Sequence, residues 1–126
     1  MKELSFLIKP TKVTPACRFD VSRQRLDFKG RSSPESSLKF YTPIMKRIEK
    51  SFINGNDKLT ANFKFEYFNT SSSKCIYDLL KQLARHKNNG ANITINWYYE
   101  EDDFDMKEAG EDYEDILGVE FNYISV

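Results

Sequence analysis

The stretch KLTANFKFEYFNTSSSKCIYDLLKQLARHKNNGANITINWYY (Lys58–Tyr99) contains a strand, a helix and a second strand in succession. Apolar and polar residues alternate over Leu59–Tyr67 and again over Asn92–Tyr99, which predicts two strands that each bury one face. Between them a helix is predicted from near Ser72 to Asn88-Asn89-Gly90, where glycine can end a helix in the left-handed conformation. Its inward residues recur at helical spacing: Cys75, Ile76, Leu79, Leu80 and Leu83. Such a unit winds right-handed and makes its two strands parallel.

Three short strands and a helix are predicted before this unit. Leu4–Ile8 alternates as a strand, and a hairpin joins the strand at Phe19–Val21 to that at Leu26–Phe28. A turn is predicted over Gly30–Pro34. The following helix presents one apolar stripe: Leu38, Tyr41, Ile44, Met45, Ile48 and Phe52. Pro43 should kink this helix or, with Thr42 as N-cap, start its regular part.

A third helix and a last strand are predicted after an acidic loop. The helix has its apolar stripe at Met106, Ala109, Tyr113, Ile116 and Leu117, and Gly118 leads to a strand with Val119, Phe121 and Tyr123 inward. The order is therefore βββ-α-β-α-β-α-β. Because the strands alternate instead of being continuously apolar, we expect a single α/β domain over residues 1–126, a mixed sheet with helices mainly on one face.

Length and composition exclude several classes of protein. A chain of 126 residues with 40% hydrophobic and 14% aromatic residues suits one packed domain and not a disordered chain. No segment approaches the roughly 20 apolar residues that span a bilayer, and no signal-peptide pattern opens the chain, so a cytoplasmic protein without membrane association is expected. Cys17 and Cys75 match no zinc or redox spacing and are expected to be buried, reduced thiols.

The net charge of zero hides two segments of opposite charge. Residues up to Tyr99 contain 18 Lys and Arg against 8 Asp and Glu, whereas Glu100–Val126 contains 1 against 11. Two differently charged solvated faces are the common explanation. A nucleic-acid-binding module is the alternative, supported by basic residues with Phe19 and Phe28 among them: Lys9, Lys12, Arg18, Arg23, Arg25, Lys29 and Arg31. Those two aromatics, however, alternate as core residues would.

Two polar loops should meet at the carboxyl edge of the parallel strands, where functional groups gather. Phe68–Lys74 is rich in hydroxyls, which can cap the next helix or accept a phosphate from a kinase, and composition leaves both open. Glu100–Asp105 lacks the ligand spacing of a calcium loop, so solvation is favoured over a metal site. His86 is the one histidine and is expected at the surface or as a cap, and no catalytic motif is present. We expect neither an enzyme nor a cofactor.

Three segments together resemble the SiaC family of bacterial regulatory phosphoproteins over nearly the whole chain. They are Phe28–Glu35 (FKGRSSPE), Glu66–Lys74 (EYFNTSSSK) and Trp97–Tyr99 (WYY). The resemblance implies a fold like that of the STAS-like anti-anti-sigma proteins. It also implies that Thr70, the threonine of the Asn-Thr-Ser-Ser motif, is the phosphorylated residue.

By the same resemblance, a dedicated protein kinase phosphorylates Thr70 and a PP2C-type phosphatase reverses this. The unphosphorylated form then binds and activates a target protein such as a diguanylate cyclase. We expect Asn69, Ser71 and Ser72 to shape and cap the Thr70 loop. We expect Ser33, Pro34 and Glu35 to frame the same partner-binding surface.

Overall fold

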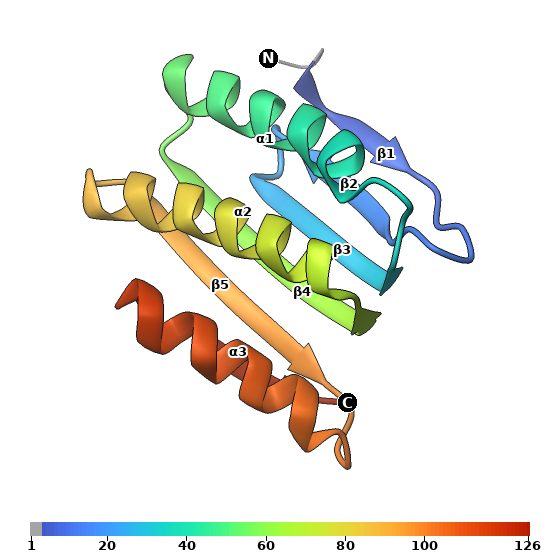
Figure 1. Cartoon of the computed structure of the whole chain (residues 1–126). Helices are drawn as coiled ribbons and strands as arrows, with labels where there is room; N and C mark the ends of the chain where they lie inside the picture. The colour runs from blue at the N-terminus through green and yellow to red at the C-terminus, as the bar shows by residue number, and fades with distance from the viewer. Residues whose placement is uncertain (1–3) are drawn as a thin grey trace.

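The computed structural model describes residues 4–126, which form one six-stranded sheet and three helices (Figure 1). The elements are β1 (Phe6–Ile8), β2 (Ala16–Asp20), β3 (Arg25–Ser32), α1 (Ser37–Ile53), β4 (Lys58–Phe68), α2 (Thr70–Asn88), β5 (Asn92–Tyr99), α3 (Phe104–Leu117) and β6 (Asn122–Ser125). The strands lie side by side in chain order. β1, β2 and β3 are antiparallel neighbours, whereas β3 to β6 are parallel. The predicted element order and mixed sheet are confirmed.

All three helices cover the same face of the sheet (Figure 1). Strand β4 shows why, because Leu59, Ala61, Phe63 and Phe65 are buried while the residues between them stay partly exposed. On the uncovered face, neighbouring strands are joined by a row of side-chain hydrogen bonds. Asn62 donates to Asp27, Asn96 donates to Asn62 and Asn122 donates to Asn96, at 2.7, 2.8 and 3.0 Å. These bonds satisfy polar groups that no helix covers.

The core is centred on Trp97 of β5, whose side chain is fully buried. Its ring contacts those of Phe63, Phe65 and Tyr113, and its indole N–H donates to the Met106 carbonyl at 2.8 Å. Cys17 and Cys75 are buried free thiols, as predicted. No helix among residues 4–126 is long and apolar enough to cross a membrane.

The predicted turn over Gly30–Pro34 is wrong in its first half, because β3 continues through Ser32. Gly30 has a φ of +118°, and the pairing of β3 with β4 shifts register between Gly30 and Arg31. Glycine is the residue that takes this conformation readily, so it allows an irregularity within the strand in place of a turn after it.

The predicted helix starts also need correction. Helix α1 begins at Ser37 with Ser36 as N-cap and passes through Pro43, so Thr42 is not a cap. Helix α2 begins at Thr70, not near Ser72, and α3 begins at Phe104, so the acidic loop ends at Asp103. Pro43 is tolerated inside α1 although it cannot donate a backbone hydrogen bond.

Three residues predicted to face inward are exposed at the surface. They are Leu38 at 67%, Tyr67 at 44% and Ile116 at 68% exposure. Each lies near an end of its helix or strand. The apolar pattern continues to that end, but the neighbouring elements that would bury the side chain do not. The buried position that periodicity missed in α3 is Gly110.

Candidate functional site

Thr70 is the first residue of α2 and lies where β4 ends, at the carboxyl edge of the parallel strands. Its side chain is exposed, and among residues 4–126 its hydroxyl has no hydrogen-bond partner. The N-cap is Asn69, whose side-chain oxygen accepts from the Ser72 backbone N–H at 2.9 Å. Asn69 therefore caps α2, and the hydroxyl of Thr70 is not needed as a cap.

The hydroxyls of the three serines after Thr70 all form hydrogen bonds within the protein. The Ser71 hydroxyl lies 2.8 Å from that of Ser37 and donates to Asn69 at 3.2 Å. Ser72 is fully buried. The Ser73 hydroxyl lies 2.9 Å from the phenol oxygen of Tyr113 on α3. Of the four side-chain hydroxyls in this run, only that of Thr70 belongs to an exposed residue and has no hydrogen-bond partner among the described residues.

A buried chain of hydroxyls holds this loop against β3 and α1. Ser32 at the end of β3 donates to Ser72 at 2.8 Å, and its oxygen lies 2.6 Å from that of Tyr41 on α1. Burial raises the pKa of Tyr41, so its phenol stays protonated and can donate. The Asn69 backbone N–H also donates to the Ser32 carbonyl at 3.0 Å. The position of Thr70 is therefore tied to three elements.

Sequence reasoning missed Ser32 and Tyr41 as members of this site. The sequence pattern places Ser32 in a turn and Tyr41 on the apolar stripe of α1, and both predictions concern local structure only. The pairing of their hydroxyls with Ser72, 40 residues further along the chain for Ser32, depends on how β3, α1 and α2 pack.

Ser33, Pro34 and Glu35 follow β3 directly and therefore lie beside the Thr70 loop. The Ser33 backbone N–H donates to the Val13 carbonyl at 2.7 Å, and its hydroxyl accepts from Arg31 at 3.3 Å. Pro34 is buried and Glu35 is exposed. All three residues follow the end of β3, next to the Thr70 loop, and only Glu35 and part of Ser33 are exposed there.

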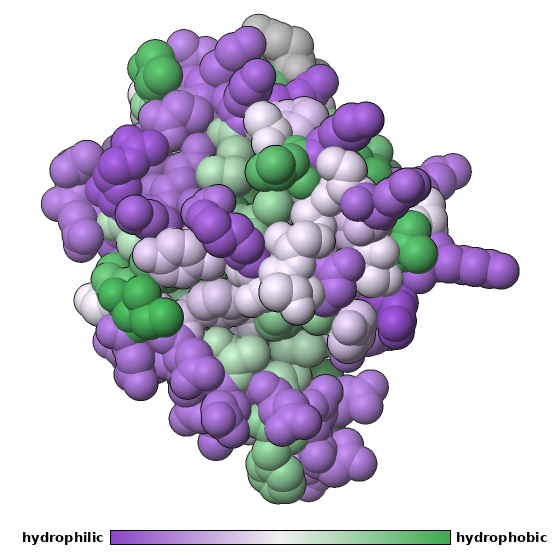
Figure 2. Space-filling model, in the orientation of Figure 1, coloured by the Kyte–Doolittle hydropathy of each residue, from purple (hydrophilic) through white to green (hydrophobic). Residues whose placement is uncertain are grey.

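Exposed apolar side chains collect at the same edge of the molecule. We define the Thr70 rim as the carboxyl ends of β3 to β6, the loops and helix starts that follow them, and the β1–β2 loop that is bonded to Ser33. Of the eight exposed large hydrophobic residues among residues 4–126, five belong to this rim: Val13, Leu38, Tyr67, Phe104 and Val126. Figure 2 shows residues of intermediate hydropathy gathered over the N-terminal halves of α1 and α2, among more hydrophilic neighbours. The rim therefore offers apolar side chains that a partner protein could cover.

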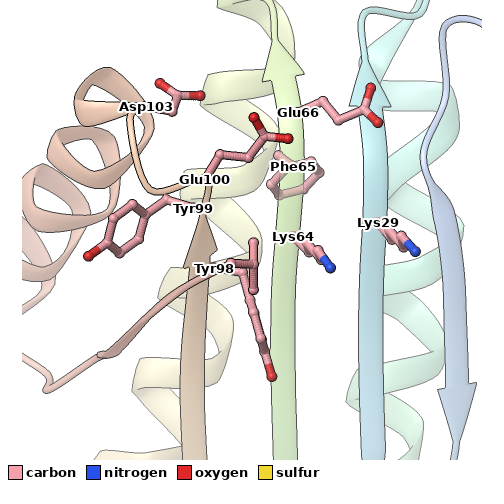
Figure 3. Close-up of a pocket in the computed structure, with 9 residues that line it drawn as sticks. Lys29, Lys64, Phe65, Glu66, Tyr98, Tyr99, Glu100 and Asp103 are labelled. Carbon is pink, nitrogen blue, oxygen red and sulfur yellow. The ribbon is translucent and has the colours of Figure 1, made fainter.

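The acidic loop lies on this rim, as predicted, because β5 runs parallel to β4. Its Asp103 caps α3 by accepting from the Met106 backbone N–H at 3.1 Å. Glu100 and Asp103 both line a cavity of about 420 Å³ that opens on the uncovered face of the sheet (Figure 3). Lys29 of β3, Lys64 of the neighbouring β4 and Tyr98 of β5 line the same cavity (Figure 3). Lysines and carboxylates are therefore mixed there, without the single charge that would select an anion or a cation.

The prediction that His86 lies at the surface or caps a helix is wrong. Its side chain is only 14% exposed, its ring stacks on Phe52 with 4.1 Å between centroids, and Nε2 lies 2.8 Å from Glu49 Oε1. It joins α2 to α1 at the end opposite Thr70, and within residues 4–126 no nucleophile is bonded to it. The geometry gives His86 a structural role.

Comparison with known proteins gives consistent matches over nearly the whole chain. The SiaC family, described as regulatory phosphoproteins, matches residues 8–126. An uncharacterized protein of Pseudomonas aeruginosa strain UCBPP-PA14 is 28% identical over 114 residues, which is 90% of each chain.

Two solved structures have the same fold. Apo-SiaC from P. aeruginosa is 26% identical, with a TM-score of 0.86 and coverage of 96% of this chain and 97% of the other. The structure of the diguanylate cyclase SiaD in complex with its activator SiaC, from the same organism, matches with 26% identity, a TM-score of 0.90 and coverage of 96% and 99%.

Proposed function

Because this chain belongs to the SiaC family of regulatory phosphoproteins, we propose that it is a non-catalytic partner switch controlled by phosphorylation of Thr70. The observation that carries the proposal is that Thr70 combines an exposed, unbonded hydroxyl with a rigidly held backbone on a partly apolar rim. A kinase can reach this hydroxyl. A protein that binds the rim must cover it.

The unphosphorylated form is the one that binds its target in this proposal. A bare threonine hydroxyl can be buried at modest cost, whereas a phosphate carrying a charge of about −1.5 to −2 must be desolvated. The exposed side chains of Leu38 and Phe104 give the rim apolar surface that favours a partner only while the charge is absent. Phosphorylation therefore weakens binding.

A diguanylate cyclase is the proposed target, because a similar structure is a complex of such a cyclase with its activator SiaC. A dedicated kinase and a PP2C-type phosphatase are the proposed enzymes that add and remove the phosphate in the cytoplasm. Ser33 and Glu35 border the binding surface, and Asn69, Ser71 and Ser72 keep its shape through the hydrogen bonds described above.

The alternative of nucleic-acid binding has less support. Phe19 and Phe28 are each 1% exposed and cannot stack on bases. Of the basic residues that favoured this reading, Arg18 and Arg23 form ion pairs with Asp20, and Arg25 forms one with Asp27. These carboxylates reduce the attraction of the N-terminal strands for phosphates.

The test is a titration of the isolated cyclase with wild-type, Thr70→Ala and Thr70-phosphorylated protein. Thr70→Ala should keep the affinity within about tenfold, roughly 1.4 kcal/mol, because the hydroxyl makes no hydrogen bond that alanine would remove. The phosphorylated protein should bind more than tenfold more weakly. Asn88→Glu, which adds charge at the far end of α2, serves as the control and should bind like wild type.

Equal or tighter binding of the phosphorylated protein would contradict the blocking mechanism. An arginine-lined phosphate receptor on the cyclase would then explain the interaction better.

A further inference from the structure

Lys74 and Asp78 form an ion pair on the exposed side of α2, one turn after Thr70. Lys74 Nζ lies 3.2 and 3.4 Å from the two Asp78 carboxylate oxygens. The Lys74 side chain is 73% exposed and that of Asp78 is 37% exposed. An exposed pair of this kind is weak, and its lysine is free to change partner.

Thr70 and Lys74 have the same spacing of four residues as Lys74 and Asp78, so all three side chains lie in one row along α2. In helices an acid four residues before a lysine stabilises more than an acid four residues after it. A phosphate on Thr70 would occupy the better position, carry more charge than a carboxylate and lie at the positive end of the helix dipole. The first turn of α2 contains no acidic residue that would compete for the lysine.

We propose that Lys74 is the residue that responds to phosphorylation, by leaving Asp78 and pairing with the phosphate on Thr70. This rests on the proposed function for its biological meaning, but its chemistry depends only on the phosphate being present. Lys74 touches no reacting atom and acts as a positioning residue for the phosphate.

Because Asp78 then loses its ion pair, phosphorylation also alters the surface around Asp78. Its side chain lines a groove of about 390 Å³ between α1 and α2, together with Leu38, Tyr41, Met45 and Gln82. When Lys74 leaves, Asp78 loses the one ion pair that it forms among the described residues, in a groove that Lys46, Glu49 and Arg85 also line. Phosphorylation thus changes the charge of a surface one to two turns from the modified residue, in addition to placing a phosphate on the rim.

The test measures the ³¹P resonance of the phosphate against pH in protein made with phosphothreonine at position 70. Lys74→Gln should raise the midpoint of the titration by about 0.3 pH units, the shift that corresponds to one helix ion pair. Asp78→Asn should lower the midpoint, because Asp78 then no longer competes with the phosphate for Lys74. The double variant should behave like Lys74→Gln alone.

The control is Lys81→Gln, which removes a lysine from the same helix two turns further on and should leave the midpoint unchanged. Circular dichroism of each variant verifies that α2 is intact. Equal midpoints for wild type and Lys74→Gln, or no effect of Asp78→Asn, would overturn the proposal while leaving the blocking mechanism at Thr70 standing. Conversely, absence of Thr70 phosphorylation in cells would remove the proposed function and leave this titration result unaffected.

Discussion

Gly110 of α3 is required by the packing of Trp97 and not by backbone conformation. A Cβ at this position would lie 2.6 to 2.8 Å from Cδ1, Nε1 and Cγ of the indole ring, closer than real contacts allow. The ring cannot move away easily, because it is fully buried and its N–H is bonded to the Met106 carbonyl. The close approach of α3 to β5 therefore depends on the missing side chain.

Gly110→Ala should lower the free energy of unfolding by about 1–3 kcal/mol, although alanine favours helix formation by about 1 kcal/mol. Urea denaturation followed by the fluorescence of Trp97 measures both stability and the environment of the ring. Gly118→Ala is the comparison without a clash, since no atom of residues 4–126 lies within 4 Å of a Cβ built there; its φ of +67° should cost about 1 kcal/mol, and the emission of Trp97 should stay as in wild type. Unchanged stability and emission in Gly110→Ala would contradict this account of the α3–β5 contact.

At the scale of elements, α1 and α2 are joined at both ends by polar contacts. Near Thr70 the contacts are hydroxyl to hydroxyl, through Ser37 and Ser71. At the opposite end Glu49 of α1 accepts hydrogen bonds from Gln82 and Arg85 and contacts His86. The bond with His86, and then those with Gln82 and Arg85, hold the pKa of Glu49 at about 2, below the ordinary 4.5, against burial that raises it.

This lowered pKa predicts how the Glu49 contribution depends on pH. A carboxylate with a lower pKa in the folded protein stabilises above its unfolded pKa of 4.5, and the effect is lost as pH falls toward about 2. Glu49→Gln should therefore lower the free energy of unfolding by about 1 kcal/mol at pH 6, and by progressively less at lower pH. The value is small because solvent screens a side chain that is a third exposed. Urea denaturation from pH 6 to pH 3 measures this, with the exposed Glu108→Gln as control. If the loss of unfolding free energy is the same at every pH, the negative charge of Glu49 does not cause the stabilisation.

At the scale of the whole molecule, opposite charges are separated along the chain but partly neutralised in the fold. The basic strands β2 and β3 include Asp20 and Asp27 as local partners, and the acidic residues follow β5 at the other side of the sheet. The aromatic residues of the basic strands face the helices. The molecule thus has a basic region without exposed Phe19 or Phe28 to stack on bases.

We therefore expect no binding to random single-stranded DNA, even at low salt, where phosphate contacts are strongest. Fluorescence anisotropy of a labelled oligonucleotide, with a single-stranded DNA-binding protein as positive control, measures this. Saturable binding that weakens as salt is added, and that is lost when Lys29 and Arg31 are both changed to Gln, would revive the nucleic-acid alternative.

The sequence by itself determined the order of the elements, the parallel β4–α2–β5 unit and the placing of helices on one face. These follow from alternation and helical spacing, which are local patterns that report burial on one side of an element. It also placed the Thr70 loop and the acidic loop on one rim, because the carboxyl ends of parallel strands lie at the same edge of a sheet.

Only the tertiary structure decided which side chains complete each site. The bond of Ser32 to Ser72, the contact of Gly110 with Trp97 and the pairing of Glu49 with His86 each join residues from different elements. Local periodicity cannot reveal such pairs, because their free energy depends on distances that exist only after the elements pack. The same reason explains why Thr70 is identified as the unbonded hydroxyl of its loop only in the fold, where its neighbours find partners on β3, α1 and α3.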